Sequence, residues 1–358
     1  MASAKGPRYT SAAFCPREFP SVPTTYQSLP ASMRAVQVMA PGRAEFIEAP
    51  LPDLQPGHAL VRTRLLSLCG SDYQWLHHFD PDDYPMAPGT TGHEVLGEVV
   101  AHDAPGHDLP PGRLALTLIP DHSGMAEYCL VKARDVLYLP PEAPPAHLLQ
   151  AQQFGTVIYA CKQLPNVIGQ DVAVIGQGSA GLWFDLMLQR MGARRVIAID
   201  LQAHRLQAGQ LYGATDTIHN AVDDPVAAVA DLTGGRMADI VIEAAGEVES
   251  VNLAVALTRR DGFLLNFGAP RASSMPFPMK GYFYKNLTMR AAVGATRDPA
   301  NSSTRQALQM IASGEVDAGP LITHSFPFDR VLEAYELQGA RDEGAIKILI
   351  DMQGANHS

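Results

Sequence analysis

Residues 172–200 read VAVIGQGSAGLWFDLMLQRMGARRVIAID, and this stretch decides the fold of the chain. The run VAVI predicts a strand, residues 179–191 predict a helix that ends at Gly192, and VIAI predicts a second strand that ends on Asp200. The turn between the first strand and the helix, GQGSAG, has the G-x-G-x-x-G spacing. Because a strand precedes the turn, a helix follows it and an acid ends the next strand, the stretch predicts a dinucleotide-binding βαβ unit.

The residue types in this turn suit a dinucleotide. Gly176 permits the tight turn, Gly178 lets a pyrophosphate approach the backbone, and Gly181 lets the helix pack close to the strand. The helix N-terminus offers N–H groups and a positive dipole end to the phosphates. Asp200 can accept hydrogen bonds from both ribose hydroxyls of NAD and would repel the 2′-phosphate of NADP, so we expect NAD. The alternative is a glycine-rich turn that binds no ligand. The predicted cofactor-binding residues of this stretch are Gly176, Gly178, Ser179, Ala180, Gly181 and Asp200.

The composition limits the possible functions. A chain of 358 residues favours two domains, and 46% hydrophobic with 18% charged residues is typical of a soluble globular protein. A net charge of −10 argues against nucleic acid as a partner, and no apolar run approaches the length of a membrane span. The four scattered cysteines form no C-x-x-C pair, which favours free thiols in a reducing, cytoplasmic compartment.

The rest of the chain falls into three parts. Residues 1–32 are rich in Pro, Ser, Thr and Ala and predict a flexible extension, an arm that packs on a neighbour, or a transit peptide. Frequent Pro and Gly in residues 33–64 favour antiparallel strands. Strand and helix patterns alternate from residue 161 to 294, which predicts a doubly wound parallel sheet with its ligand at the carboxyl ends of the strands.

Candidate metal ligands lie upstream of the glycine turn. Residues 69–72 read CGSD and residues 92–99 read GHEVLGEV. A Cys thiolate and a neutral imidazole are ligands that zinc prefers, and a carboxylate can complete the set. Cys69, His93 and Glu94 are therefore candidates, although a lone cysteine or histidine is more often structural.

The order of these motifs carries a family resemblance. CGSD, GHEVLGEV, GMAEY at residues 124–128, GQGSAG, IVIEAAG at 240–246 and GFLLNFG at 262–268 follow one another. Over residues 33–352 the chain resembles the zinc-containing medium-chain alcohol and polyol dehydrogenases. The resemblance implies an α/β fold in which a Rossmann NAD-binding domain, residues 161–294, is inserted in a GroES-like, chaperonin-10-like β-barrel catalytic domain, residues 33–160 and 295–358.

The resemblance also implies roles for single residues. Cys69 and His93 would hold one catalytic zinc, Glu94 would lie beside or on the metal, and Ser71 would hydrogen-bond the substrate hydroxyl and pass its proton outward. Further cofactor contacts would come from Thr156, Arg205, Ala245, Phe267 and Gly268. The strand at residues 287–293 would pair across a dimer interface, so we expect a homodimer or homotetramer; the alternative is an ordinary edge strand.

Three departures from the family pattern affect the site. The lobe with four closely spaced cysteines that binds a structural zinc in relatives is missing, so we expect no structural zinc. The last catalytic ligand, a Cys, Glu or Asp in relatives, falls on Gln152, whose carbonyl oxygen is a weaker ligand. The His that follows CGSD in polyol-type relatives is Gln74 here, and His77 or His78 could replace it in a proton relay.

The expected activity is NAD-dependent, zinc-assisted oxidation of a secondary alcohol, polyol or cyclitol to the carbonyl, or the reverse, with hydride passing to nicotinamide C4. A small-molecule alcohol or carbonyl is the expected substrate. Two alternatives stay open: a zinc-free reductase acting on an activated double bond or carbonyl, and a non-catalytic NAD-binding scaffold. Four aromatic residues could line the substrate pocket or belong to the core: Trp75, Phe79, Tyr84 and Phe154.

Overall fold

A sheet of six parallel strands forms around residues 172–200, within the part of the chain that the computed structural model describes, residues 24–294, 297–340 and 344–352. The strand order is β11-β10-β9-β12-β13-β14, in which the first strand, β9, lies in the middle and the order reverses between β9 and β12. This is the doubly wound Rossmann order, and it confirms the predicted fold class. The strands are β9 (Asp171–Ile175), β10 (Arg195–Asp200), β11 (Asp216–His219), β12 (Ala238–Glu243), β13 (Thr258–Asn266) and β14 (Thr288–Ala291).

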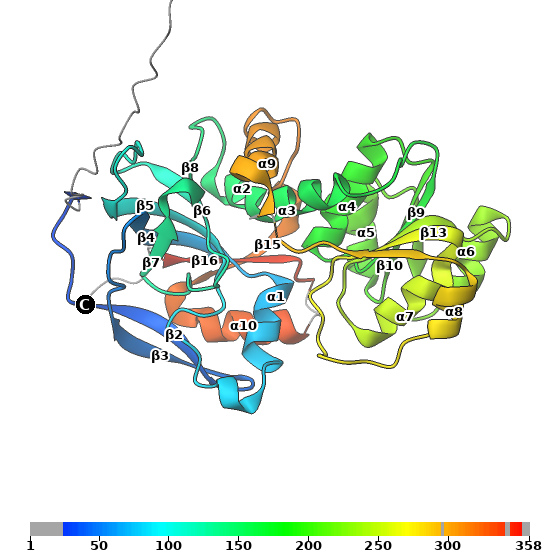
Figure 1. Ribbon diagram of the computed structural model, residues 1–358, viewed down its shortest axis with the longest axis horizontal. Coiled ribbons are helices and arrows are strands. Elements are labelled where there is room, and N and C mark those ends of the chain that lie inside the picture. The colour runs from blue at the N-terminus through cyan, green and yellow to red at the C-terminus, as the bar shows by residue number, and fades with distance from the viewer. Residues whose placement is uncertain (1–23, 295–296, 341–343, 353–358) are drawn as a thin grey trace, which may run out of the picture.

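Helices cover both faces of this sheet, as Figure 1 shows. All residues of β9 and β12 are buried, which is why their sequences are nearly continuous apolar runs. The predicted turn is as tight as its glycines require, because a Cβ on Gly181 would lie 1.9 Å from the carbonyl oxygen of Gly176. The helices of this half are α4 (Ser179–Arg190), α5 (Ala203–Leu211), α6 (Pro225–Thr233), α7 (Val248–Leu257) and α8 (Met279–Tyr284).

A second, mostly antiparallel sheet forms the other half of the molecule (Figure 1). Its strands run in the order β15-β16-β4-β5-β6-β8, with β1 added to β5 and β7 added to β4. The C-terminal strand β16 pairs with β4, so the end of the chain returns to the half in which it began. The strands are β1 (Thr24–Thr25), β4 (His58–Ser67), β5 (Glu94–Asp103), β6 (Leu114–Leu118), β7 (Tyr128–Lys132), β8 (Val136–Tyr138), β15 (Ile322–Pro327) and β16 (Lys347–Asp351), and a separate hairpin pairs β2 (Ser32–Ala40) with β3 (Arg43–Pro50).

One hydrophobic core joins the two sheets. It contains buried residues of β5 and β6 as well as of β9 and β12, and α3 and α9 lie between the two sheets in Figure 1. Phe154 of α3 is fully buried and stacks on Trp183 at 4.4 Å between ring centroids, so it belongs to this core and not to a substrate pocket. The remaining helices are α1 (Gly70–His77), α2 (Pro145–Leu149), α3 (Ala151–Cys161), α9 (Ser302–Ala312) and α10 (Val331–Ala340).

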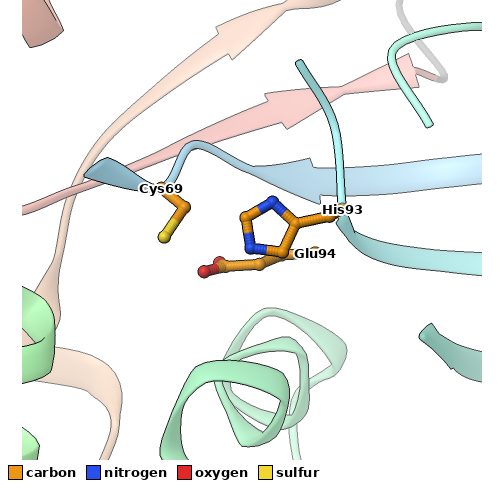
Figure 2. A group of neighbouring side chains, drawn as sticks. All are labelled: Cys69, His93 and Glu94. Atoms are coloured by element: carbon orange, nitrogen blue, oxygen red, sulfur yellow. The ribbon is translucent and has the colours of Figure 1, made fainter. Parts of the chain in front are cut away.

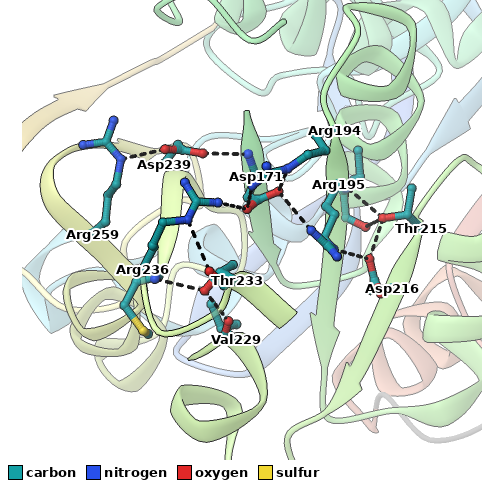
Figure 3. A network of polar contacts seen from close by, with 12 residues as sticks. Asp171, Arg194, Arg195, Thr215, Asp216, Val229, Thr233, Arg236, Asp239 and Arg259 are labelled. Atoms are coloured by element: carbon teal, nitrogen blue, oxygen red, sulfur yellow. Dashed lines mark hydrogen bonds and ion pairs between the residues drawn. The ribbon is translucent and has the colours of Figure 1, made fainter. Parts of the chain in front are cut away.

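A charged network lies at the amino ends of the parallel strands (Figure 3). The buried carboxylate of Asp171, where β9 begins, contacts the guanidinium groups of Arg194, Arg195 and Arg236. Burial alone would raise the pKa of Asp171, but the arginines outweigh it and lower that pKa. Since ligands of such sheets bind at the opposite, carboxyl ends, we assign this network to the stability of the sheet.

The first described residues differ from the predicted flexible extension. Thr24 and Thr25 pair with β5 of their own chain, and the Tyr26 hydroxyl donates to the Leu109 carbonyl at 2.8 Å. The predicted extension at residues 1–32 otherwise stays a prediction, because residues 1–23 lie outside the described part. In that part, no helix has the length and apolar character needed to span a membrane. The division of domains at residues 161 and 294 stays a prediction.

Candidate active site

The paired strands β4 and β5 bring Cys69 and His93 together. Ser67, the last residue of β4, is the register partner of Glu94, the first residue of β5. Cys69 follows β4 as the N-cap of α1, and His93 directly precedes β5. As Figure 2 shows, the thiol, the imidazole and the carboxylate turn toward one another, and their potential ligand atoms all lie within 4.8 Å of one another.

The buried carboxylate of Asp72 organises this group. Its Oδ2 accepts a hydrogen bond from the backbone N–H of Cys69 at 2.7 Å, while its Oδ1 lies 3.1 Å from Nδ1 of both His93 and His122. Burial would raise the pKa of Asp72, but the two histidines lower it to about 2. An ionised Asp72 can only accept, so each Nδ1 carries a hydrogen and Nε2 of His93 is left for a metal.

The same interactions raise the pKa of His93. Burial lowers this pKa, but the negative charge of Asp72 and the hydrogen bond to it outweigh burial and raise it well above its usual value. A metal at Nε2 would therefore have to displace a proton, which makes metal binding weaker at low pH.

Glu94 is held by a second buried charge. Nζ of Lys347 lies 2.7 Å from Oε1 and 2.6 Å from Oε2, and Ser67 donates a hydrogen bond to Oε2. Both side chains of the ion pair are fully buried, so each charge depends on the other for compensation. Glu94 thus lies beside the candidate metal position with both oxygens already engaged.

The fourth side of the group is formed by Gln153, the residue next to the predicted Gln152. Nε2 of Gln153 lies 3.5 Å from the Cys69 thiol, whereas Gln152 accepts a hydrogen bond from the Thr156 hydroxyl at its backbone carbonyl. Gln153 is therefore a second candidate for the predicted oxygen ligand, on a side of α3 about 100° away from Gln152, and the assignment of Gln152 stays a prediction. Oε1 of Gln153 is buried and has no hydrogen-bond partner among the described residues.

This set of donors fits a zinc ion. A thiol, an imidazole with an oriented Nδ1–H and a neighbouring carboxylate are typical zinc ligands. A rotation of the Gln153 amide would turn its unpartnered oxygen toward the thiol, where a metal ion would give it a partner.

A cavity of ≈ 610 Å³ connects the glycine turn with the Cys69 loop. On one side it is lined by Leu68 and Gly70, the sequence neighbours of Cys69, and by Tyr73 of α1. Among the described residues it brings together these predicted cofactor contacts: Gly176, Gly178, Ser179, Asp200, Arg205 and Ala245. Other predicted contacts do not line it: Thr156, Ala180, Gly181, Phe267 and Gly268.

Asp200 faces this cavity from the end of β10. Its Oδ2 accepts from the backbone N–H of Gln177 at 2.6 Å and its Oδ1 accepts from that of Gln202 at 2.8 Å. These bonds hold the carboxylate in one orientation beside the glycine turn.

The candidates for a proton relay lie around α1. Ser71 is in the first turn of this helix, between Cys69 and Asp72 in sequence. The ring of Tyr73, which lines the cavity, lies 4.2 Å from the ring of His77 and 5.7 Å from that of His78. His77 therefore contacts a residue that lines the cavity, Tyr73.

Four residues of the site were not assigned a role from the sequence: Asp72, His122, Gln153 and Lys347. Asp72 could have been found, because it ends the CGSD motif, and Lys347 is a single cation in the apolar run IKILI. No local sequence pattern identifies His122 as a site residue, and none distinguishes Gln153 from Gln152. Two of the predicted pocket aromatics, Trp75 and Phe79, stack at 4.4 Å beside His122, and the Tyr84 hydroxyl accepts from the Phe79 N–H at 3.4 Å.

Comparison with known proteins matches both halves of the chain. Residues 55–141 match the family described as alcohol dehydrogenase GroES-like domain, and residues 181–313 match the zinc-binding dehydrogenase family. The chain is 28% identical to an alcohol dehydrogenase of Cupriavidus necator, over 89% of this chain and 99% of that protein. It is 27% identical to a sorbitol dehydrogenase of Gallus gallus, over 88% and 95% of the two chains.

A solved structure agrees with these matches. The alcohol dehydrogenase of Thermus sp. ATN1 superposes with a TM-score of 0.74 at 28% identity, covering 89% of this chain and 99% of that one. The predicted combination of a GroES-like domain and a Rossmann sheet is thereby confirmed.

We expect Asp72→Asn to weaken zinc binding by about 10- to 100-fold, because an amide N–H in place of Oδ1 would face the Nδ1–H of His93 and favour the tautomer that cannot bind metal through Nε2. Competition with a chromogenic chelator measures the affinity. Asp121→Asn, at an exposed aspartate of the His122 loop, is the matched control. Equal affinities of the two variants would contradict the role given to Asp72.

Proposed function

Because the chain belongs to the zinc-type medium-chain dehydrogenase family, we propose that it oxidises a secondary alcohol or polyol with NAD, or reduces the corresponding carbonyl. One observation carries the proposal: the ligand atoms of Cys69, His93 and Glu94 converge beside the cavity that also holds the glycine turn and Asp200. A reductase without metal, or an NAD-binding scaffold, would have no use for this convergence.

One catalytic zinc is part of the proposal. Cys69 and His93 would hold it, with Gln153 or Glu94 as a further oxygen ligand. Zinc in such a site supplies a Lewis acid for the substrate oxygen, and NAD supplies the hydride acceptor.

The residues of the chain itself orient and deprotonate the substrate. Asp72 holds the His93 imidazole in the tautomer and orientation that metal binding needs. Ser71 would relay the proton of the substrate hydroxyl, accepting it while its own hydroxyl proton passes on to a further acceptor. His77, whose ring lies 4.2 Å from that of the cavity-lining Tyr73, is the candidate for this acceptor. Burial lowers the pKa of His77, which favours its neutral form and so its ability to take up this proton.

NAD is the proposed cofactor in preference to NADP. The oriented carboxylate of Asp200 supports this, since it can accept hydrogen bonds from ribose hydroxyls and would repel a 2′-phosphate. Arg205, on the same side of the cavity, donates to the Ala345 carbonyl at 3.1 Å and so links the cofactor cleft to the C-terminal segment.

We further propose that two copies associate along β14. This strand pairs with β13 on one side, and in the described part of the chain its other side carries no further strand. Large apolar side chains are exposed nearby: Met279, Phe283, Tyr284 and Val293. An open strand edge beside an exposed apolar patch favours pairing with a second copy.

Zinc analysis tests the metal. Protein purified without chelator should contain about one zinc per chain. Cys69→Ala should lose both zinc and alcohol oxidation, because the thiolate is the strongest ligand of the set. Cys161→Ala, at a buried cysteine in the core, should keep the metal. Wild-type protein that oxidises alcohols without bound zinc would contradict the zinc-assisted mechanism.

Cofactor kinetics test Asp200. In Asp200→Ala we expect the ratio of kcat/KM with NAD to kcat/KM with NADP to fall at least about tenfold, equal to ~1.4 kcal/mol. The ratio is the informative quantity, because a general loosening of the turn would weaken both cofactors alike. Asp231→Ala, at an exposed acid of α6, serves as the control. An unchanged ratio in Asp200→Ala would refute the role.

Light scattering tests the association. Phe283→Asp should shift the protein from dimer or tetramer to a smaller species, because it places a charge in the patch beside β14. Leu211→Asp, at an exposed leucine on α5, is the matched control. A wild-type protein that is monomeric at micromolar concentration would disprove the proposed interface.

A further inference from the structure

A buried carboxyl group lies close to the glycine turn. Asp185 belongs to α4, the helix that begins within this turn, and its side chain is inaccessible to solvent. Neither of its oxygens has a hydrogen-bond donor among the described residues. Because a buried polar group without a partner is costly, this carboxyl needs a compensating interaction.

A second buried oxygen lies beside this carboxyl. Gln177, the second residue of the glycine turn, is also inaccessible to solvent, and in the described part of the chain its Oε1 has no donor either. A Cβ on Gly209 of α5 would lie 2.9 Å from Oε1 of Gln177 and 3.2 Å from Oδ2 of Asp185. Both oxygens therefore face the same glycine, whose missing side chain leaves room for the pair.

The two side chains complement each other when Asp185 carries a proton. Burial raises the pKa of Asp185 well above its usual value, and the opposing effect of the Gln177 side chain is smaller. A protonated carboxyl group has an O–H donor, whereas an ionised one can only accept, as can the amide oxygen of Gln177. The neutral acid can therefore donate to Oε1 of Gln177.

Gln177 connects this pair to the proposed cofactor contacts. Its Nε2 donates to the Val174 carbonyl of β9 at 3.3 Å, and its backbone N–H donates to Oδ2 of Asp200 at 2.6 Å. A displacement of Gln177 would therefore move both the backbone of the glycine turn and the carboxylate that faces the cavity.

We propose that Asp185 is a positioning residue for NAD, whose carboxyl O–H donates to the amide oxygen of Gln177 and so holds the glycine turn and Asp200 in the geometry that binds the dinucleotide. Asp185 does not line the cavity and acts on the cofactor through Gln177. This inference rests on the proposed function, and it concerns the affinity for the cofactor.

Two substitutions of similar shape test the donor. Asp185→Asn keeps an N–H donor in place of the O–H, whereas Asp185→Leu has none. In a fluorescence titration of the zinc-loaded protein with NADH, we expect Asp185→Leu to weaken binding about tenfold and Asp185→Asn to stay within about twofold of the wild type. Asp185→Ala, which also lacks a donor, should show the loss seen in Asp185→Leu. Leu188→Met, at another buried position of α4, is the control for a change of packing alone and should leave the affinity unchanged.

A double-mutant cycle tests whether Asp185 acts through Gln177. In a Gln177→Leu background the amide oxygen is absent, so the further substitution Asp185→Leu should not weaken NADH binding again. A general disturbance of the core would instead lower the affinity by the same factor in both backgrounds, and such additivity would overturn the proposal.

The remaining outcomes separate this inference from the function on which it rests. Wild-type affinity in Asp185→Leu, or a loss in Asp185→Asn as large as that in Asp185→Leu, would overturn the role of Asp185. Wild-type protein that binds NADH but oxidises no alcohol would refute the proposed dehydrogenase function, while the NADH affinities of the variants would still decide the role of Asp185.

Discussion

The carboxylate of Asp72 is the constraint on which the site depends. It is fully buried, and its oxygens accept hydrogen bonds from the Cys69 backbone and from both His93 and His122. One negative charge thereby fixes the start of α1, the position of the thiol and the tautomers of two imidazoles. Because a buried charge needs several hydrogen bonds to be tolerated, these elements cannot rearrange independently. With Nδ1 of His93 held by Asp72, Nε2 is the nitrogen of that ring that remains for the proposed metal.

A second buried charge ties this site to the end of the chain. Lys347 lies on β16 and Glu94 on β5, and the ion pair between them is inaccessible to solvent. Since β16 also pairs with the end of β4, two residues before Cys69, it supports both halves of the ligand set. The Lys347 ammonium, which also donates to the Leu68 carbonyl at 3.2 Å, competes with a metal for Glu94. This makes Cys69 and His93 the principal candidate ligands, with Glu94 as an electrostatic neighbour.

The interior of the molecule explains why the two halves meet at the cavity. A common core runs from β5 and β6 through α3 to β9 and β12. On the other side of the cavity, Gln338 of α10 donates to the Cys69 carbonyl at 2.7 Å, and Arg205 of α5 reaches the Ala345 carbonyl. The glycine turn and the Cys69 loop are therefore opposite walls of one space, although about a hundred residues separate them in sequence.

Much of the fold could be predicted from the sequence alone. The strand, turn, helix and acid of residues 172–200 have local causes, namely apolar runs, glycines at fixed spacing and a helix stop. The identity of Cys69, His93 and Glu94 as a group followed from residue chemistry and motif order. The contact between Gln153 and the Cys69 thiol did not follow, because periodicity does not determine which of two adjacent glutamines faces the thiol.

Contacts between residues far apart in sequence determined the parts of the site that the sequence did not predict. His122 reaches Asp72 across 50 positions of sequence, and Lys347 reaches Glu94 across 253, and no local pattern encodes either pairing. In the sequence, Phe154 cannot be distinguished from the other aromatic candidates for the substrate pocket. In the structure it is buried against Trp183 of α4. The sequence by itself therefore determined the nucleotide-binding unit and the candidate ligands, because short-range sterics and ligand chemistry suffice for them. Only the tertiary structure decided what surrounds those ligands, because burial and hydrogen bonding there come from strands and loops that meet only in the folded chain.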